Sequence, residues 1–167
     1  VYGSAKVYGN AKVYGNAWVS GNAKVSGNAE VYDEAWVYGN AKVSDNAWVS
    51  GNAKVYDDSL VYGDSLVSDS AKVYGDAQVY GDAQVSGNAE VSDNAEVSSS
   101  KDYIVFKNTW SSFRWFTYTK SNKMWKVGCF YGTGAELIAK AYEDSEKSGK
   151  CYEAYVNLVS ELEKIGE

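Results

Sequence analysis

Carboxylates are the side chains of this sequence that most clearly gather in one region. Nine Asp and Glu residues against one Lys give residues 55–96 a net charge of −8. Within that stretch Asp58 and Asp76 are eighteen residues apart, and so are Asp64 and Asp82. If each pair lies together, the carboxylates could bind a cation or form a DNA-like negative face that occupies a nucleic-acid-binding protein. They could also be solvated corners in which Asp replaces Asn, the interpretation that we favour.

The sequence contains no His. Histidine is the commonest general base near neutral pH and a common metal ligand, so catalysis would have to use carboxylates, Lys, Tyr or Cys. Cys129 follows Gly128, but without a His to raise its thiolate fraction we expect it to be a small buried hydrophobic residue. Cys129 and Cys151 are too few for a secreted disulfide scaffold. We therefore expect no catalytic residue, no metal ion and no cofactor.

A basic and aromatic stretch follows at residues 101–126. It carries six Lys or Arg residues against Asp102, a net charge of +5, and it includes Arg114 next to Trp115. Basic residues interleaved with aromatic residues on a sheet are suited to single-stranded nucleic acid. Two other interpretations are a protein partner and internal complementarity, in which this stretch faces the acidic residues 55–96. We favour internal complementarity.

A hexapeptide repeat must position most of these residues. Val recurs at every sixth position from Val1 to Val97, which makes sixteen hexapeptides plus one Val. Val and the small residue two positions before it share one face of an extended strand and predict a core. Between them, pairs such as Gly-Asn and Gly-Asp tolerate left-handed backbone angles and predict a corner. A short strand and a corner, repeated, coil the chain.

These units, such as VYGNAK at 7–12, resemble the hexapeptide-repeat proteins. The resemblance covers residues 1–97 and implies a left-handed parallel β-helix of triangular section with about five coils. Many members of that family are acyltransferases that use a His between subunits, and related carbonic anhydrases hold zinc with three His residues. Because this chain has no His, the resemblance implies the fold alone.

Three walls follow from coils of eighteen residues. Trp18 and Trp36 fall one above the other on one wall, to which we also assign Tyr14 and Tyr32, and Trp48 falls on another wall. We expect the exposed tryptophans to form an interface. We expect the tyrosines to form stacking ladders that stiffen the coils. A further ladder, assigned to the remaining wall, comprises Tyr38, Tyr56 and Tyr74.

The repeat stops after Val97, and residues 98–100 read as a linker to a second domain at 101–167. We expect a small α+β domain with a three-stranded meander, followed by two helices. A capping box of Thr133 and Glu136 predicts the start of the first helix, and Gly149 its end. The three expected strands span residues 103–107, 113–120 and 124–130.

The segment GCFYGT at 128–133 looks like part of a small domain that follows hexapeptide repeats in bacterial and bacteriophage proteins. The resemblance extends over about 103–160, implies a phage or mobile-element origin, and transfers no activity. The plainest role of such a domain is to cover the last coil.

We therefore expect a mainly β, non-catalytic protein-binding or scaffolding protein. It would be a phage-encoded inhibitor of a host defence protein. Its binding residues would lie among the tryptophans and tyrosines above, the acidic columns, Arg114 and Trp115. The alternatives are a nucleic-acid-binding or carbohydrate-binding structural module and, least favoured, an acyltransferase-like enzyme. Because Val1 opens directly into a full repeat, we also expect a dimer or trimer joined through the Trp18 and Trp36 wall. The first residues do not resemble a signal peptide, and the sequence has no run of about 20 apolar residues. We therefore expect no membrane association and a bacterial cytoplasmic location.

Overall fold

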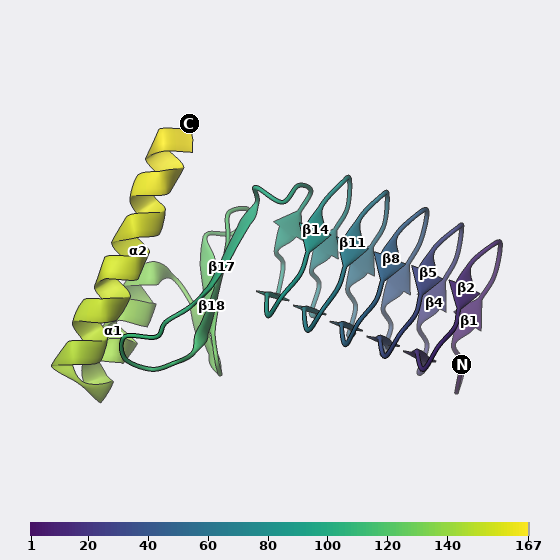
Figure 1. Cartoon of the computed structure of the whole chain (residues 1–167), viewed down its shortest axis with the longest axis horizontal. Helices are drawn as coiled ribbons and strands as arrows, with labels where there is room; N and C mark the ends of the chain where they lie inside the picture. Colours follow the sequence, from purple (N-terminus) through teal and green to yellow (C-terminus); the bar gives the residue numbers. More distant parts are fainter. Residues whose placement is uncertain (167) are drawn as a thin grey trace.

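The chain forms a parallel β-helix followed by an antiparallel sheet and two helices (Figure 1). The computed structural model describes residues 1–166. Glu167, the last residue of the expected second domain, lies outside the described residues. The parallel β-helix of about five coils, capped by a small α+β unit, confirms the predicted fold class.

Sixteen two-residue strands build the three walls of the β-helix. Strands three apart in sequence pair in parallel with a register of eighteen residues, so that Val7 pairs with Val25 and Trp18 with Trp36. The sheets have the strand orders β1-β4-β7-β10-β13-β16, β2-β5-β8-β11-β14 and β3-β6-β9-β12-β15. The strands are β1 (Lys6–Val7), β2 (Lys12–Val13), β3 (Trp18–Val19), β4 (Lys24–Val25), β5 (Glu30–Val31), β6 (Trp36–Val37), β7 (Lys42–Val43), β8 (Trp48–Val49), β9 (Lys54–Val55), β10 (Leu60–Val61), β11 (Leu66–Val67), β12 (Lys72–Val73), β13 (Gln78–Val79), β14 (Gln84–Val85), β15 (Glu90–Val91) and β16 (Glu96–Val97).

The core of the β-helix consists of Val and Ala. Every repeat Val from Val19 to Val97 is fully buried, as are the Ala residues that precede them from Ala23 onward. Ser59 and Ser65 replace Ala in two hexapeptides. The Ser59 hydroxyl donates to the Tyr56 carbonyl at 2.7 Å, so this buried hydroxyl is not left unpaired. The inward register of Val is as the repeat predicts.

The C-terminal sheet has four strands where three were expected. Strand β17 (Tyr103–Lys107) pairs with β18 (Trp115–Thr119), β18 with β19 (Met124–Val127), and β19 with β20 (Phe130–Gly132). The expected strand 124–130 is divided because Gly128, at φ 55°, turns the chain back so that Val127 pairs with Phe130. The expectation that Cys129 is buried is wrong, because this turn leaves it exposed. Strand β18 begins later than residue 113 because Phe113 also has a positive φ of 55°.

Two helices follow the sheet, α1 (Gly134–Asp144) and α2 (Glu146–Gly166). The predicted capping box is present: the Glu136 N–H donates to Thr133 Oγ1 at 3.3 Å, and the Thr133 N–H donates to Glu136 Oε2 at 2.8 Å. The prediction that Gly149 ends the first helix is wrong, because the extended residue Ser145 separates the helices and Gly149 is buried within α2. Neither helix has both the length and the apolar composition needed to cross a bilayer, within residues 1–166.

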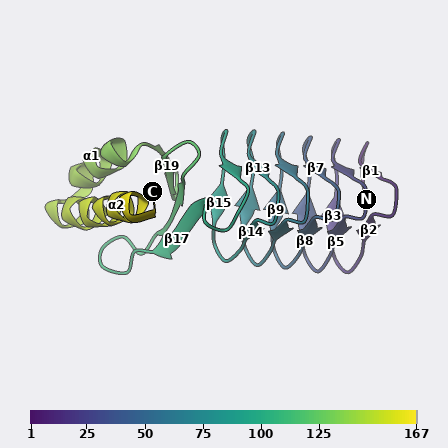
Figure 2. The same cartoon turned by 90° about the horizontal axis from the view of Figure 1, so that it is seen from above.

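The sheet lies between the last coil and the helices (Figures 1 and 2). Alternation along β17 explains the arrangement, because Tyr103 and Val105 pack on the solenoid core while Ile104 and Phe106 pack on the helix side. Hydroxyl and amide groups complete the junction. Thr117 Oγ1 accepts from the Glu90 N–H at 3.0 Å, Ser121 Oγ accepts from the Glu96 N–H at 2.8 Å, and Asn122 Nδ2 donates to Asn94 Oδ1 at 3.2 Å.

Candidate functional site

An unbroken row of aromatic rings runs along the wall built by β3, β6, β9 and β12. We call it the aromatic strip. Tyr2, at the N-terminal end, has the largest exposed fraction in the strip. Trp18 and Trp36 follow, at 46% and 43% exposed. Successive ring centroids lie 4.9, 5.7, 6.5, 4.9 and 4.9 Å apart, with one edge-on contact between Trp36 and Tyr38 and stacked contacts elsewhere. The strip comprises Tyr2, Trp18, Trp36, Tyr38, Tyr56 and Tyr74.

The strip follows from strand alternation. In each hexapeptide the small residue and Val point inward, so the residue before Val and the residue after it both point outward from the same wall. Trp18 and Trp36 occupy the first outward position, and Tyr38 occupies the second. The Lys54 ammonium lies 5.2 Å from the Trp36 ring centroid. Neighbours therefore cover the ring faces of Trp18 and Trp36, and their edges face solvent.

The structure corrects the walls assigned to the tyrosines. Tyr14 and Tyr32 lie beside the wall of β2, β5 and β8, not on the Trp18 wall: the Tyr14 hydroxyl donates to Glu30 Oε2 at 2.9 Å, and the Tyr32 ring meets Trp48 edge-on at 6.3 Å. The three-tyrosine ladder that we assigned to the β1 wall instead continues the aromatic strip. A single strip over the coils was therefore missed, although the alternation rule could have found it.

A hydrogen bond to a carboxylate holds Tyr14 in its neutral form, and burial does the same for Tyr74. The hydrogen bond to Glu30 raises the pKa of Tyr14 to about 12. Hydrogen bonds from Lys12 and Tyr14 in turn lower the pKa of the Glu30 carboxyl. Burial raises the pKa of Tyr74 to about 12, with a further contribution from Glu90. At neutral pH these phenols are hydrogen-bond donors and stacking surfaces.

The acidic columns continue ladders of Asn side chains at the corners. Asn40 Nδ2 donates to Asp58 Oδ1 at 3.0 Å, and Asn46 Nδ2 donates to Asp64 Oδ1 at 2.9 Å. These contacts repeat the Asn22 to Asn40 hydrogen bond of an earlier coil. They fit the favoured interpretation of Asp as a replacement for Asn in the same turn. Asp76 and Asp82 follow one coil later, and within residues 1–166 no group of three or more His, Cys, Asp or Glu side chains is arranged to hold a metal ion.

The C-terminal sheet faces the last acidic coils, as internal complementarity predicts, but ion pairs between described residues do not make this contact. Among residues 1–166, no ion pair within 4.0 Å joins residues 101–126 to a solenoid carboxylate. Lys72 and Glu90 pair within the solenoid at 2.9 Å. The junction instead uses the hydroxyl and amide contacts described above. The basic side chains of the C-terminal sheet therefore keep their charge available for another contact.

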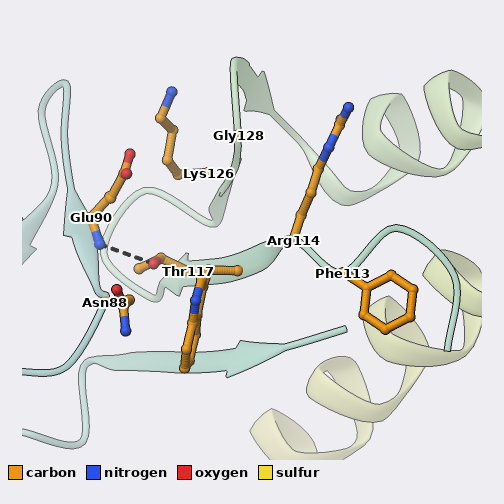
Figure 3. Close-up of a pocket in the computed structure, with 8 residues that line it drawn as sticks. Asn88, Glu90, Phe113, Arg114, Thr117, Lys126 and Gly128 are labelled. Atoms are coloured by element: carbon orange, nitrogen blue, oxygen red, sulfur yellow. Dashed lines mark hydrogen bonds between the residues drawn. The ribbon is translucent and has the colours of Figure 1, made fainter. Parts of the chain in front are cut away.

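A small cleft lies at this junction (Figure 3). Asn88 and Glu90 of the last coils form one side, and the sheet and its loops form the other. The volume of the cleft is about 190 Å³. The structure brings Arg114 and Trp115 together here, far from the aromatic strip's exposed tryptophans near the N-terminal end. The lining residues are Asn88, Glu90, Phe113, Arg114, Trp115, Thr117, Lys126 and Gly128.

The loop between β17 and β18 carries two aromatic side chains whose exposure sequence reasoning missed. Trp110 is 74% exposed and Phe113 is 65% exposed. The buried side chain of Asn108 holds this loop: its Nδ2 donates to Ser111 Oγ at 2.9 Å, and its Oδ1 accepts from the Trp110 N–H at 3.0 Å. The available signal was the placement of aromatic residues within a segment of Asn, Thr and Ser, a composition that predicts a turn.

Comparison with known proteins bears on the repeats only. A family model described as YdcK beta solenoid repeat matches residues 5–21. With the parallel coils described above, this match supports a hexapeptide-repeat-like β-helix segment in this chain. No match was found among curated proteins or among solved structures.

Proposed function

We propose that this protein is a non-catalytic binding and scaffolding protein that presents the aromatic strip to a protein partner. The observation that carries the proposal is the continuity of the strip, which includes two tryptophans close to half exposed. Exposed Trp and Tyr residues are enriched among the residues that dominate protein–protein affinity. Strand pairing and ring stacking hold them in place, so little side-chain entropy is lost on binding.

The chemistry of the surroundings suggests the partner surface. Tyr56 is followed by Asp57 and Asp58, and Asp76 lies one coil beyond Asp58. The strip therefore has an acidic border in its later coils. A partner with an apolar centre and a basic rim would match this arrangement, and the rim charges would mainly increase the association rate.

A carbohydrate platform is the second candidate for the same strip. Sugars stack on the faces of exposed aromatic rings. Here Tyr2 and Trp36 lie against the Trp18 ring, and Trp18 and Lys54 lie against the Trp36 ring. Ring edges are better suited to a protein surface, so we prefer the protein partner. In line with the resemblance of residues 103–160, we propose a host protein in the bacterial cytoplasm as that partner, inhibited by a phage-encoded chain.

Matched tryptophan variants test the proposal. Trp48, 47% exposed, occupies the same position of the hexapeptide on another wall, so Trp48→Ser is the control for Trp18→Ser/Trp36→Ser. Proteins captured from host lysate are identified by mass spectrometry, purified, and titrated by calorimetry against each variant. We expect the double variant to weaken binding at least about thirtyfold, as loss of a hot spot does, and the control to bind as wild type. Equal affinity of all three proteins would contradict the proposal.

A further inference from the structure

Two cationic side chains line the junction cleft, and a third lies over the ring of a tryptophan that lines it. The Lys107 ammonium lies 6.0 Å from the Trp115 ring centroid, and Arg114 and Lys126 line the same cleft. In Figure 3 the Arg114 and Lys126 side chains extend toward the same side of the sheet. Among residues 1–166, none of the three forms an ion pair with a carboxylate. The lining of the cleft therefore combines positive charge with an indole.

The register of the sheet produces this cluster. Trp115 and Thr117 are two apart in β18 and so lie on one face, which is the face toward the solenoid. Lys107 pairs with Trp115 across the first ladder, and Lys126 pairs with Thr117 across the second. Cross-strand partners share a face, so the two lysines flank Trp115 and Thr117.

The acidic side chain of the cleft is already engaged. Glu90 Oε1 accepts from the Lys72 ammonium at 2.9 Å, and Glu90 Oε2 accepts from the Tyr74 hydroxyl at 3.4 Å. The Glu90 charge is therefore balanced within the solenoid. Asn88 adds a neutral amide to the lining. An anion that enters the cleft would meet two free cations of the lining, Arg114 and Lys126, and no free carboxylate from the lining.

The loop that carries Arg114 is fixed before any ligand binds. Asn108 is buried and holds the loop, and the Asn108 N–H donates to the Arg114 carbonyl at 2.9 Å. The Tyr152 hydroxyl donates to Ser112 Oγ at 2.8 Å. Phe113 has a φ of 55°, a conformation that bulky residues rarely adopt and that clusters at binding sites. Arg114 thus leaves the loop in a defined direction.

We propose that this cleft binds a nucleotide, either free or as a unit of a single strand. The inference concerns a different surface from the aromatic strip and goes beyond the proposed function. The partly exposed indole of Trp115 would stack with a base, and Arg114 and Lys126 of the lining would contact the phosphates, with Lys107 adding positive charge beside the indole. A duplex keeps its bases stacked within the helix, so it would not offer a base to Trp115. An acidic peptide would satisfy the cations but leave the indole without a planar partner.

Fluorescence anisotropy with a labelled oligothymidine of about twelve nucleotides tests the inference, since single-strand sites span about 4–16 nucleotides. We expect binding that Trp115→Ala weakens about tenfold. Arg114→Gln and Lys126→Gln should each weaken binding and reduce the salt dependence by about 0.7 in the slope of log K against log salt concentration. Circular dichroism verifies that each variant is folded. Absence of binding would overturn the proposal.

Two controls separate this site from a generally adhesive surface. Trp110→Ala removes a more exposed tryptophan of the same loop that does not line the cleft, and Lys147→Gln removes a charge from α2. Both variants should bind as wild type, and loss in either would overturn the proposal. Uridine monophosphate that competes as well as the strand would identify a free nucleotide as ligand, whereas weaker competition would identify the strand. Polyglutamate that competes as well as the strand would assign the surface to acidic peptides and also overturn it.

Discussion

The carboxylate of Asp45 accepts a hydrogen bond from the backbone N–H of Gly63, one coil later, at 3.1 Å. Asp45 itself has a positive φ of 59°. The same contact recurs from Asp33 to Gly51 at 3.2 Å, and each of these Asp residues replaces the corner Gly of its hexapeptide. The carboxylate thus links successive coils at a corner whose backbone conformation favours Gly.

Substitutions at Asp45 should separate the hydrogen bond from the backbone conformation. Asp45→Ala removes the acceptor and keeps a Cβ at positive φ, so we expect the free energy of unfolding to fall by about 1–2 kcal/mol. Asp45→Gly also removes the acceptor but relieves the backbone, so we expect a change within about 0.5 kcal/mol. Denaturation in urea, followed by circular dichroism, measures both. An Ala variant as stable as the Gly variant would contradict this account.

A charge in the Val core should prevent folding. Val43 is fully buried among Val and Ala, and a carboxylate there would have no partner. We expect Val43→Asp to cost at least about 5 kcal/mol, comparable with the stability of a typical domain. Lys42 is the outward neighbour in the same strand, so Lys42→Asp should change stability by only about 0.5 kcal/mol. A soluble Val43→Asp protein with an unchanged circular dichroism spectrum would show that the register is wrong.

The turn at residues 98–102 should be sensitive to acid through Asp102. Burial acts to raise the pKa of Asp102, but hydrogen bonds from the Ser98 hydroxyl and from the Ser98 and Ser99 N–H groups together lower it below its ordinary value. A carboxyl whose pKa is lower in the folded state stabilises that state above the unfolded pKa, and loses this contribution as pH falls through the folded pKa.

Thermal denaturation as a function of pH tests this linkage. We expect Asp102→Asn to have a lower melting temperature than wild type at pH 7, and the difference to shrink as the pH falls below about 4, the ordinary range for Asp. A difference that is independent of pH would mean that Asp102 stabilises the turn at residues 98–102 through its shape and not through its charge.

The periodic part of the chain could be predicted because two local rules agree there. Val and Ala alternate with outward residues, and Gly or Asp takes the positive φ at each corner, so every strand from Lys6 to Val97 follows from sequence. The wall of Tyr14 was misassigned although it follows from the same alternation. The aromatic strip was therefore missed as one surface, even though Trp18 and Trp36 were singled out.

The C-terminal sheet and its cleft depend on contacts that no local pattern contains. Gly128 divides an apolar run into two strands because of its positive φ, and Phe113 delays β18 in the same way. Arg114 and Trp115 were expected to act in binding, but the partners that gather around them come from β19 and from the last coils. Such a juxtaposition is set by the ladder register, which the sequence leaves open until the turns are known.

Gly149 illustrates the same limit and gives a further prediction. A Gly after a helical run usually ends the helix. Here Gly149 lies within α2 and packs against the ring of Tyr142 of α1, which would overlap a Cβ at position 149. We expect Gly149→Ala to lower the free energy of unfolding by about 1–3 kcal/mol through overpacking. Gly166 lies at the end of the same helix, and apart from its own helix backbone no described atom lies within 4 Å of its Cβ position, so Gly166→Ala should not destabilise the protein. Chemical denaturation compares the two, and equal stability would contradict the packing account.

Self-association through the aromatic strip is the last prediction. Trp18 and Trp36 lie side by side on one wall with nearly half of each side chain exposed. When the partner is absent, a second copy could bury them in a two-fold or three-fold arrangement, since the two tryptophans repeat at the coil spacing. We expect light scattering at micromolar concentration to show a dimer or trimer. Because apolar burial would drive it, the assembly should persist in about 1 M salt, where charge contacts are screened within about 3 Å. We expect Trp18→Ser/Trp36→Ser to be a monomer and Trp48→Ser to assemble as wild type. A monomeric wild type would disprove self-association through this wall, and so would an assembly that the double substitution leaves unchanged.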